Sequence, residues 1–246
     1  MSRYDLPQEI LQGVFWVGNR QTDDFLRCNP YLLDLGEEYA LIDPGGWEDF
    51  APVMEKILCV TDLSRLKYIV LQHQDPDICA MVPLIEDMVE TPLTILTHPY
   101  NLPFLKHYGI RSSSQSILEN GGKFSPEKSS LVLEFLSTPY LHSPGSFMTL
   151  MSQHKVLFSS DLFGWVGLED WDLFDTRLER QGYADWHLQI VPHKKILKPI
   201  LEKVRDLDLE MIAPQHGSVL KGKDTLNRIY AKLEKINYSL KEILGE

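Results

Sequence analysis

The stretch LQHQDPDICAM, residues 71–81, places one imidazole and two carboxylates directly after an apolar run. That run, YIVLQ at residues 68–72, has the composition of a buried strand. His73, Asp75 and Asp77 follow it at alternate positions. Such a pattern is typical either of a polar turn that caps the next helix or of ligands that converge on a metal ion. The rest of the chain has to decide between these two interpretations.

The composition is that of an ordinary globular protein. The chain has 246 residues, of which 43% are hydrophobic and 24% are charged. Thirty-five acidic residues against 24 Lys and Arg give a net charge of −11. A nucleic-acid-binding protein needs a basic surface that neutralises phosphates, and the sequence contains no basic stripe. We therefore expect no nucleic-acid partner.

Neither a membrane nor an oxidising compartment is indicated. No apolar run approaches the roughly 20 residues that span a bilayer, and residues 1–11 lack a secretory apolar segment. We expect a cytoplasmic protein without membrane association. Three cysteines without C-x-x-C spacing argue against a disulfide framework and against a thiolate zinc site. Cys28 and Cys59 are predicted to be structural thiols, whereas Cys79, inside the 71–81 stretch, stays undecided.

Residues 1–221 are predicted to form one α/β domain, because no Ser-, Gly- or Pro-rich linker divides them. Apolar and turn patterning predicts extended segments over residues 13–19, 29–36, 38–46, 66–72, 93–97, 131–142, 147–161 and 209–216. Helical patterning covers residues 47–60, 78–89, 101–109 and about 176–207.

Residues 222–246 are predicted to form a separate C-terminal amphipathic helix. Aliphatic residues recur there with the 3-4 spacing of a heptad seam: Leu226, Ile229, Leu233, Ile236, Leu240 and Ile243. The helix either folds onto the domain's own surface or acts as a dimerising or signal-carrying helix that leads towards a further domain. Fewer than three heptads do not decide between these alternatives, so a homodimer remains one of them.

Four apolar runs end in a side chain that can bind a metal: His73, His142, Asp161 and His216. In layered α/β folds, functional groups collect where strands end, because rigid strands hold the loops that present them. With Asp75 and Asp77, the set contains three imidazoles, three carboxylates and no thiolate. These donors suit Fe or Mn better than a structural zinc ion. The four-helix carboxylate scaffold is excluded, because none of the eight histidines has Glu three residues before it.

Five motifs in this order and spacing resemble the metallo-β-lactamase fold: ALIDPGG (40–46), HQDPD (73–77), STPYLHSPGS (137–146), LFSSDLFG (157–164) and IAPQHG (212–217). Within that superfamily they look like the di-iron branch, which comprises the flavodiiron proteins and their shorter relatives, the oxygen-binding di-iron proteins. The resemblance covers about residues 10–220. It implies an α/β fold built as a metallo-β-lactamase-like four-layer αββα sandwich.

The resemblance also implies a binuclear site that holds two Fe ions, for which Zn or Mn could substitute. His73, Asp75 and His142 would hold one ion, and Asp77 and His216 the second, with Asp161 bridging both beside an oxo, hydroxo or O2-derived ligand. The di-iron branch carries a carboxylate at the position of Asp75. Hydrolases of the superfamily carry a histidine where this chain has Ile78, so the second metal loses one nitrogen.

Two further residues are assigned by the same resemblance. Asp43 is similar to the aspartate that the superfamily keeps near the site for support. Tyr183 either corresponds to a site-facing tyrosine of the flavodiiron branch or is a packed core tyrosine. The remaining histidines match no motif and are expected to be structural or exposed: His98, His107, His154, His187 and His193.

An O2-binding di-iron protein, most simply an oxygen sensor, is the function that the resemblance implies. Reduction of O2 to water needs four electrons, and the chain has no G-x-G-x-x-G loop or second α/β unit for a flavin. One alternative is therefore an oxidoreductase that reduces O2 or NO with electrons from a separate redox partner. Another is a binuclear metallohydrolase acting on phosphodiesters or thioesters. A sensor would further need a signalling partner or domain.

Overall fold

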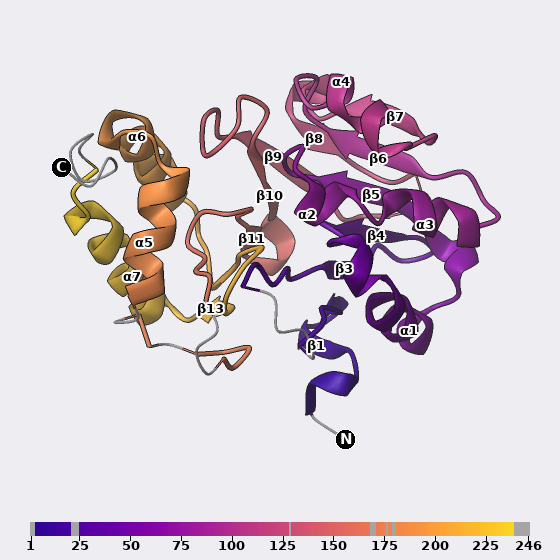
Figure 1. The fold of residues 1–246 in the computed structure, drawn as a ribbon, viewed down its shortest axis with the longest axis horizontal. Helices are drawn as coiled ribbons and strands as arrows, with labels where there is room; N and C mark the ends of the chain where they lie inside the picture. The colour runs from indigo at the N-terminus through magenta and orange to yellow at the C-terminus, as the bar shows by residue number, and fades with distance from the viewer. Residues whose placement is uncertain are drawn as a thin grey trace.

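The computed structural model of this chain describes residues 3–20, 25–127, 129–167, 171–175, 177–178 and 181–238. It confirms the predicted fold class, a four-layer αββα sandwich. Two mixed sheets pack face to face, and helices cover the outer face of each (Figure 1). Short 3-10 turns lie at Arg3–Asp5, Trp47–Asp49, Leu63–Arg65, Lys106–Tyr108, Glu119–Gly121 and Ser152–His154.

The first sheet has seven strands in sequence order: β1 (Gln8–Leu11), β2 (Val14–Trp16), β3 (Tyr31–Asp34), β4 (Tyr39–Ile42), β5 (Leu66–Leu71), β6 (Thr94–Thr97) and β7 (Ser113–Ser116). Pairing is antiparallel up to β4 and parallel from β4 to β7. Strand β5 shows the period of two: Val70 faces the second sheet, whereas Ile69 and Leu71 face the helices. Both faces of β5 are therefore buried, as its continuous apolar sequence predicts.

The second sheet has six strands in the order β13-β12-β11-β10-β9-β8. Their bounds are β8 (Lys123–Phe124), β9 (Leu133–Ser137), β10 (Phe147–Met151), β11 (Val156–Phe158), β12 (Met211–Ala213) and β13 (Leu220–Lys221). Strands β11 and β12 are parallel neighbours, and the other pairs are antiparallel. The ends of β11 and β12 therefore lie side by side, which brings the loops that follow them together.

Helices α1 (Phe50–Val60), α2 (Pro76–Cys79), α3 (Val82–Met88) and α4 (Leu102–Leu105) cover the first sheet, and α5 (Gln181–Ile190), α6 (Lys194–Arg205) and α7 (Lys223–Lys235) cover the second (Figure 1). The prediction of one continuous helical region over about 176–207 is wrong in one respect. The helix is interrupted between Ile190, where α5 ends, and Lys194, where α6 begins. Pro192 disfavours a helical Val191, and the imidazole of His193 caps α6 by accepting from the Lys195 N–H at 3.0 Å.

Helix α7 packs against the other helices that cover the second sheet. Its buried residues Leu226, Ile229 and Leu233 share a core cluster with Leu201 and Val204 of α6. The helix ends at Lys235, and Ile236 is already extended. The predicted continuation through Leu240 and Ile243 lies outside the described residues. Among the described helices, none combines the length and apolar character needed to cross a bilayer.

Asn29 connects the two sheets. It is completely buried, and its side-chain N–H groups donate to the carbonyls of Pro214 and Gly217 at 3.1 and 2.9 Å. Its oxygen accepts from the Trp16 indole N–H at 2.9 Å. Two of these bonds join the chain between β2 and β3 to the loop after β12, and the third ties Asn29 to the end of β2, so one side chain connects the two sheets.

Asn29→Ala would leave the buried Trp16 indole N–H without its partner. The Pro214 and Gly217 carbonyls would each lose one hydrogen bond but keep those from Tyr31 and Trp171. We expect it to lower the free energy of unfolding by about 1–3 kcal/mol, the cost of one orphaned buried polar group. Urea denaturation measures the change. Asn227→Ala, at an exposed position of α7, is the control and should shift the value by less than about 0.5 kcal/mol. Equal effects of the two substitutions would contradict the proposed role of Asn29.

Candidate metal centre

The 71–81 stretch leaves β5 and immediately enters a tight turn. His73 is completely buried, and the Asp75 backbone N–H donates to its Nδ1 at 3.2 Å. Its Nε2 therefore faces the interior. Asp75 stands at the extended position before α2, and Pro76 begins that helix, where its missing N–H costs nothing. Asp75 holds the N-cap position of α2, but its side chain makes no capping hydrogen bond. The geometry therefore favours the ligand interpretation, with His73 and Asp75 in one donor group and Asp77 in another.

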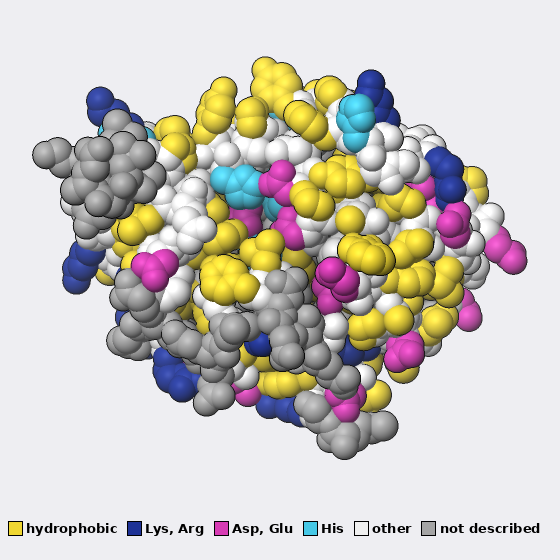
Figure 2. Space-filling model, in the orientation of Figure 1, with side chains coloured by type: hydrophobic (Ala, Val, Ile, Leu, Met, Phe, Trp, Pro, Cys, Tyr) yellow, Lys and Arg dark blue, Asp and Glu magenta, His cyan; other side chains and the backbone are white. Residues whose placement is uncertain are grey.

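The structure brings all six predicted residues together. His142 lies between β9 and β10, Asp161 follows β11 and His216 follows β12. They meet the 73–77 turn at the edge where these strands end. Figure 2 shows histidine and acidic side chains side by side near the middle of one face, bordered by hydrophobic side chains. His142 and Asp75 are partly exposed, with 26% and 36% of their side chains accessible, so small molecules can reach this side of the cluster.

One group of donors comprises His73, Asp75 and His142, whose ligand atoms all lie within 4.8 Å of one another. His142 Nε2 lies 3.3 Å from Asp75 Oδ2 and 2.9 Å from Asp161 Oδ2. His73 Nε2 lies 3.6 Å from the same Asp161 oxygen. Asp161 Oδ2 therefore completes a set of two nitrogens and two oxygens.

A second group forms around the other oxygen of Asp161. His216 Nε2 lies 3.4 Å from Asp161 Oδ1 and 3.4 Å from Asp77 Oδ2. The Nδ1–H of His216 donates to the Arg27 carbonyl at 2.9 Å, the arrangement that fixes the tautomer of metal-binding histidines. Asp161 thus directs one oxygen to each group, as a carboxylate that bridges two ions must do.

Asp161 provides the test of whether the residues fit a metal. Its side chain is 1% exposed, yet neither carboxylate oxygen accepts a hydrogen bond of good geometry. Burial would raise its pKa, but the imidazoles of His73, His142 and His216 hold the pKa well below its usual range. A buried, ionised carboxylate needs cations around it. Two metal ions meet that need, so the residues fit a binuclear centre.

His73 leads to the same conclusion. Burial would lower its pKa, but the surrounding carboxylates, Asp161 first among them, raise it to about 9. Protons on the imidazoles balance the carboxylates when no cation is bound. A divalent ion would displace these protons and take over the same charge balance.

Asp43 supports the centre from behind. Its oxygens accept from the Gln72 backbone N–H at 2.9 Å and from the Gln72 side chain at 2.7 Å. Gln72 immediately precedes His73, so these bonds hold the strand end that presents the imidazole. Burial raises the pKa of Asp43 to about 6. The supporting role that the sequence suggested agrees with this geometry.

Tyr183 and four of the five histidines without motifs lie outside the two donor groups. Tyr183 is 1% exposed and packs with the rings of Trp165 and His187 at centroid distances of 6.3 and 6.5 Å, which favours a core role. His187 is completely buried, His98 is buried, and His107 and His193 are exposed. None of these four histidines belongs to either donor group.

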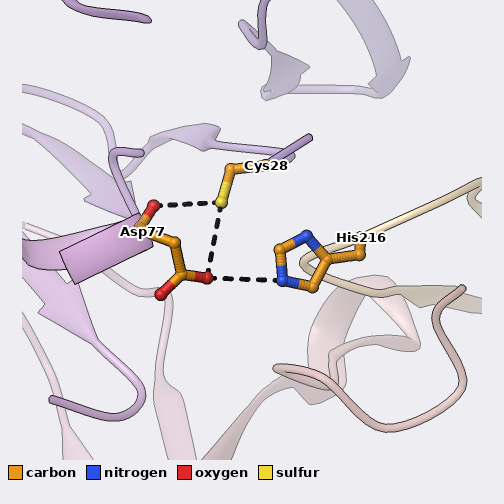
Figure 3. Close-up of side chains that lie close together, drawn as sticks. All are labelled: Cys28, Asp77 and His216. Atoms are coloured by element: carbon orange, nitrogen blue, oxygen red, sulfur yellow. Dashed lines mark hydrogen bonds and ion pairs between the residues drawn. The ribbon is translucent and has the colours of Figure 1, made fainter. Parts of the chain in front are cut away.

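Two residues in the centre were missed by sequence reasoning. The Gln215 side chain lies between the groups: Oε1 is 2.7 Å from His73 Nε2, and Nε2 donates to Asp77 Oδ2 at 2.6 Å. The thiol of Cys28 joins Asp77 and His216 in the second group (Figure 3). Gln215 adjoins a motif histidine and could have been noticed. Cys28 carried no signal, because it is far from every motif in the sequence.

A four-layer sandwich with imidazoles and carboxylates at its strand ends defines a domain of the metallo-β-lactamase type. Residues 26–217 match the family described as ODP family beta lactamase, and the chain belongs to this family.

Among characterised proteins, the chain is similar to the coenzyme F420H(2) oxidase of Methanothermobacter marburgensis. The two are 29% identical over 245 residues, and the match covers 86% of this chain and 57% of the oxidase. The chain therefore spans little more than half the length of that relative.

Two solved structures share the fold. The flavodiiron protein from Giardia intestinalis superposes with a TM-score of 0.81 at 21% identity, covering 96% of this chain and 60% of that protein. A structure described as the peroxy diiron species of the chemotaxis sensor ODP also has a TM-score of 0.81, at 22% identity. The superposition covers 98% of this chain and 99% of that one, so the two chains match over nearly their entire lengths.

The loop that carries Asp161 depends on a neutral His187. His187 Nε2 accepts from the Phe163 N–H at 3.1 Å, and Nδ1–H donates to the Tyr183 carbonyl at 2.6 Å. Burial lowers the pKa of His187 to about 4, below its unfolded value of about 6.5. Protonation therefore favours the unfolded chain, and stability is lost as the pH falls from about 6.5 to 4.

In His187→Gln this pH dependence should disappear. Relative to that variant, we expect the wild type to lose up to about 3 kcal/mol of unfolding free energy between pH 7 and pH 4. Urea denaturation at a series of pH values measures the difference. The control is His107→Gln at an exposed position, which should keep the wild-type pH profile. An unchanged profile in His187→Gln would show that the imidazole is not held neutral.

Proposed function

We propose that this protein binds two iron ions between its two donor groups, binds O2 there, and acts as an oxygen sensor. The observation that supports this most directly is Asp161, whose two buried oxygens face different sets of donors. A bridging carboxylate holds two ions about 3.5–4 Å apart, close enough for one small molecule to contact both. When bound, a ferrous pair supplies two electrons to O2.

The protein's own residues control access to the centre. Asp75 and His142 are partly exposed, whereas Asp161 and His216 are buried, so a diatomic molecule enters on the side of the first group. On the second group, the Trp186 ring packs edge-on against His216 at 5.2 Å, and its N–H donates to the Asp161 carbonyl at 3.1 Å. This indole excludes water from the buried half of the site.

A reductase role is the second candidate. The similarity to an F420H(2) oxidase favours it, since that relative is by name an enzyme that consumes electrons. Reduction of O2 or NO would need a separate electron donor such as a rubredoxin or flavodoxin. Similarity to the chemotaxis sensor over nearly its entire length favours the sensor role. A signalling partner, a homodimer and a cytoplasmic location stay predictions.

Asp161→Ala should abolish binding of both metal ions. Anaerobic titration with Fe(II) is expected to give two equivalents per wild-type chain and fewer than one in the variant, because each group loses one oxygen and the two groups lose their bridge. Asp208→Ala removes an exposed carboxylate that pairs with Lys155 and should retain both equivalents. Two tightly bound ions in Asp161→Ala would rule out the bridging role.

Exposure of the ferrous protein to O2 should produce a long-lived visible absorption band without continuous O2 consumption. Sustained consumption of O2 or NO with a rubredoxin or flavodoxin donor would instead establish the reductase. Immediate bleaching, or no band at full iron occupancy, would contradict O2 binding. In that case the metallohydrolase prediction can be tested by asking whether metal-dependent hydrolysis of phosphodiesters or thioesters disappears in Asp161→Ala.

A further inference from the structure

The second donor group contains a thiol that the six-residue ligand pattern does not include. Cys28 is 3% exposed and precedes β3. Its backbone forms an isolated antiparallel bridge with His216, and the next residue, Asn29, donates its N–H to the Gln215 carbonyl at 2.6 Å. Backbone pairing therefore holds the thiol beside the imidazole, independently of any contact between the two side chains.

Three separations among the four donors match those around one ion. Cys28 Sγ lies 3.8 Å from Asp77 Oδ2, which lies 3.4 Å from His216 Nε2 (Figure 3). His216 Nε2 is in turn 3.4 Å from Asp161 Oδ1. Ligands that surround a tetrahedral ion at 2.0–2.3 Å are about 3.3–3.8 Å from one another. All three separations fall in this range. The Gln215 side-chain N–H group lies among the donors, 2.6 Å from Asp77 Oδ2 and 3.6 Å from Cys28 Sγ, and has to turn away when an ion enters.

A second observation, independent of the thiol, points to a cation at the same place. Asp161 Oδ1 is buried and accepts no hydrogen bond of good geometry, although His216 Nε2 lies 3.4 Å from it. Ile78 has an aliphatic side chain without a donor atom, and it is completely buried in the core between the first sheet and its helices. Without Cys28, an ion here would have two carboxylates and one imidazole. With Cys28 it has four protein ligands, the same number as the other ion.

We propose that Cys28 binds, as a thiolate, the metal ion held by Asp77, Asp161 and His216, and that this half of the centre prefers a thiophilic divalent cation such as Fe(II) or Zn(II). The inference rests on the proposed metal centre. As the metal–sulfur bond forms, the thiol proton leaves to solvent, since a coordinating dication deprotonates a thiol. The two halves then differ chemically: one offers two nitrogens and two oxygens, the other one sulfur, one nitrogen and two oxygens.

The unequal halves have a consequence for metal selection. Thiolate ligands favour Zn and Fe over Mn, whereas carboxylate-rich sites accept Mn and Mg. Zn(II) added to the apoprotein would fill the half that contains Cys28 first. A mixed metal pair could therefore form in defined positions.

A purely structural thiol is the competing explanation, because Cys28 Sγ–H also donates to the Asp77 carbonyl at 3.0 Å. Cys28→Ser distinguishes a structural thiol from a metal ligand, since a hydroxyl keeps the hydrogen bond but is a poor ligand for a soft ion. The matched control keeps Cys28 as the sole cysteine by combining Cys59→Ser at an exposed position with Cys79→Ala.

Anaerobic titration of the apoproteins with Co(II) tests the proposal. The wild type and the sole-cysteine variant should develop a near-ultraviolet sulfur-to-cobalt charge-transfer band that saturates with one of the two equivalents. In Cys28→Ser the band should be absent, and that equivalent should bind at least about tenfold more weakly, since even residues behind the ligands cost 10–100-fold. A band that persists in Cys28→Ser would overturn the proposal.

X-ray absorption of the wild type loaded with one equivalent of Zn(II) gives an answer that does not depend on the folding of any variant. A sulfur neighbour at about 2.3 Å is expected. Two bound ions without a sulfur neighbour would overturn the role of Cys28 and leave the binuclear centre intact. Failure to bind any metal would overturn both this proposal and the proposed function.

Discussion

The ionised carboxylate of Asp161 is the constraint on which the centre depends. It is buried, and neither of its oxygens is satisfied by a good hydrogen bond. An isolated buried charge costs several kcal/mol, so the fold must bring positive charge to both oxygens. Imidazoles from three separate loops surround it. The convergence of residues from four strand ends is therefore an electrostatic requirement as well as a pattern of ligands.

The scaffold meets this requirement with backbone and buried polar contacts that leave little freedom. Asp43 holds the strand end before His73 through Gln72, and Asn29 ties the β12 loop to the first sheet. Around the candidate metal centre, Asp43, Ser160 and Phe163 adopt positive φ values of 47°, 52° and 70°. Non-glycine residues are strained there, and such strain persists only where the surrounding structure determines it.

The two donor groups have the same number of protein donors but lie in different environments. The first is open to solvent through Asp75 and His142, and the second is enclosed by Trp186 and includes a thiol. Exposure favours exchange of small ligands at the first group, whereas burial and softer donors favour tight retention of a metal at the second. The proposed binding of O2 depends on both properties, retention of the ions and an accessible side.

Local pattern was sufficient for an α/β domain with candidate ligands at its strand ends, and the resemblance of motifs such as HQDPD and IAPQHG to a known family implied the sandwich fold and the convergence of six residues. Local pattern was insufficient for short polar strands such as β7, Ser113–Ser116, which exist only because β6 offers them a parallel edge. It also missed the break before α6 and the position of Cys28. The contacts of Cys28 join residues 49 and 187 positions apart, and no local period encodes a separation of that length. Only the packing of the two sheets decides which distant side chains share a site.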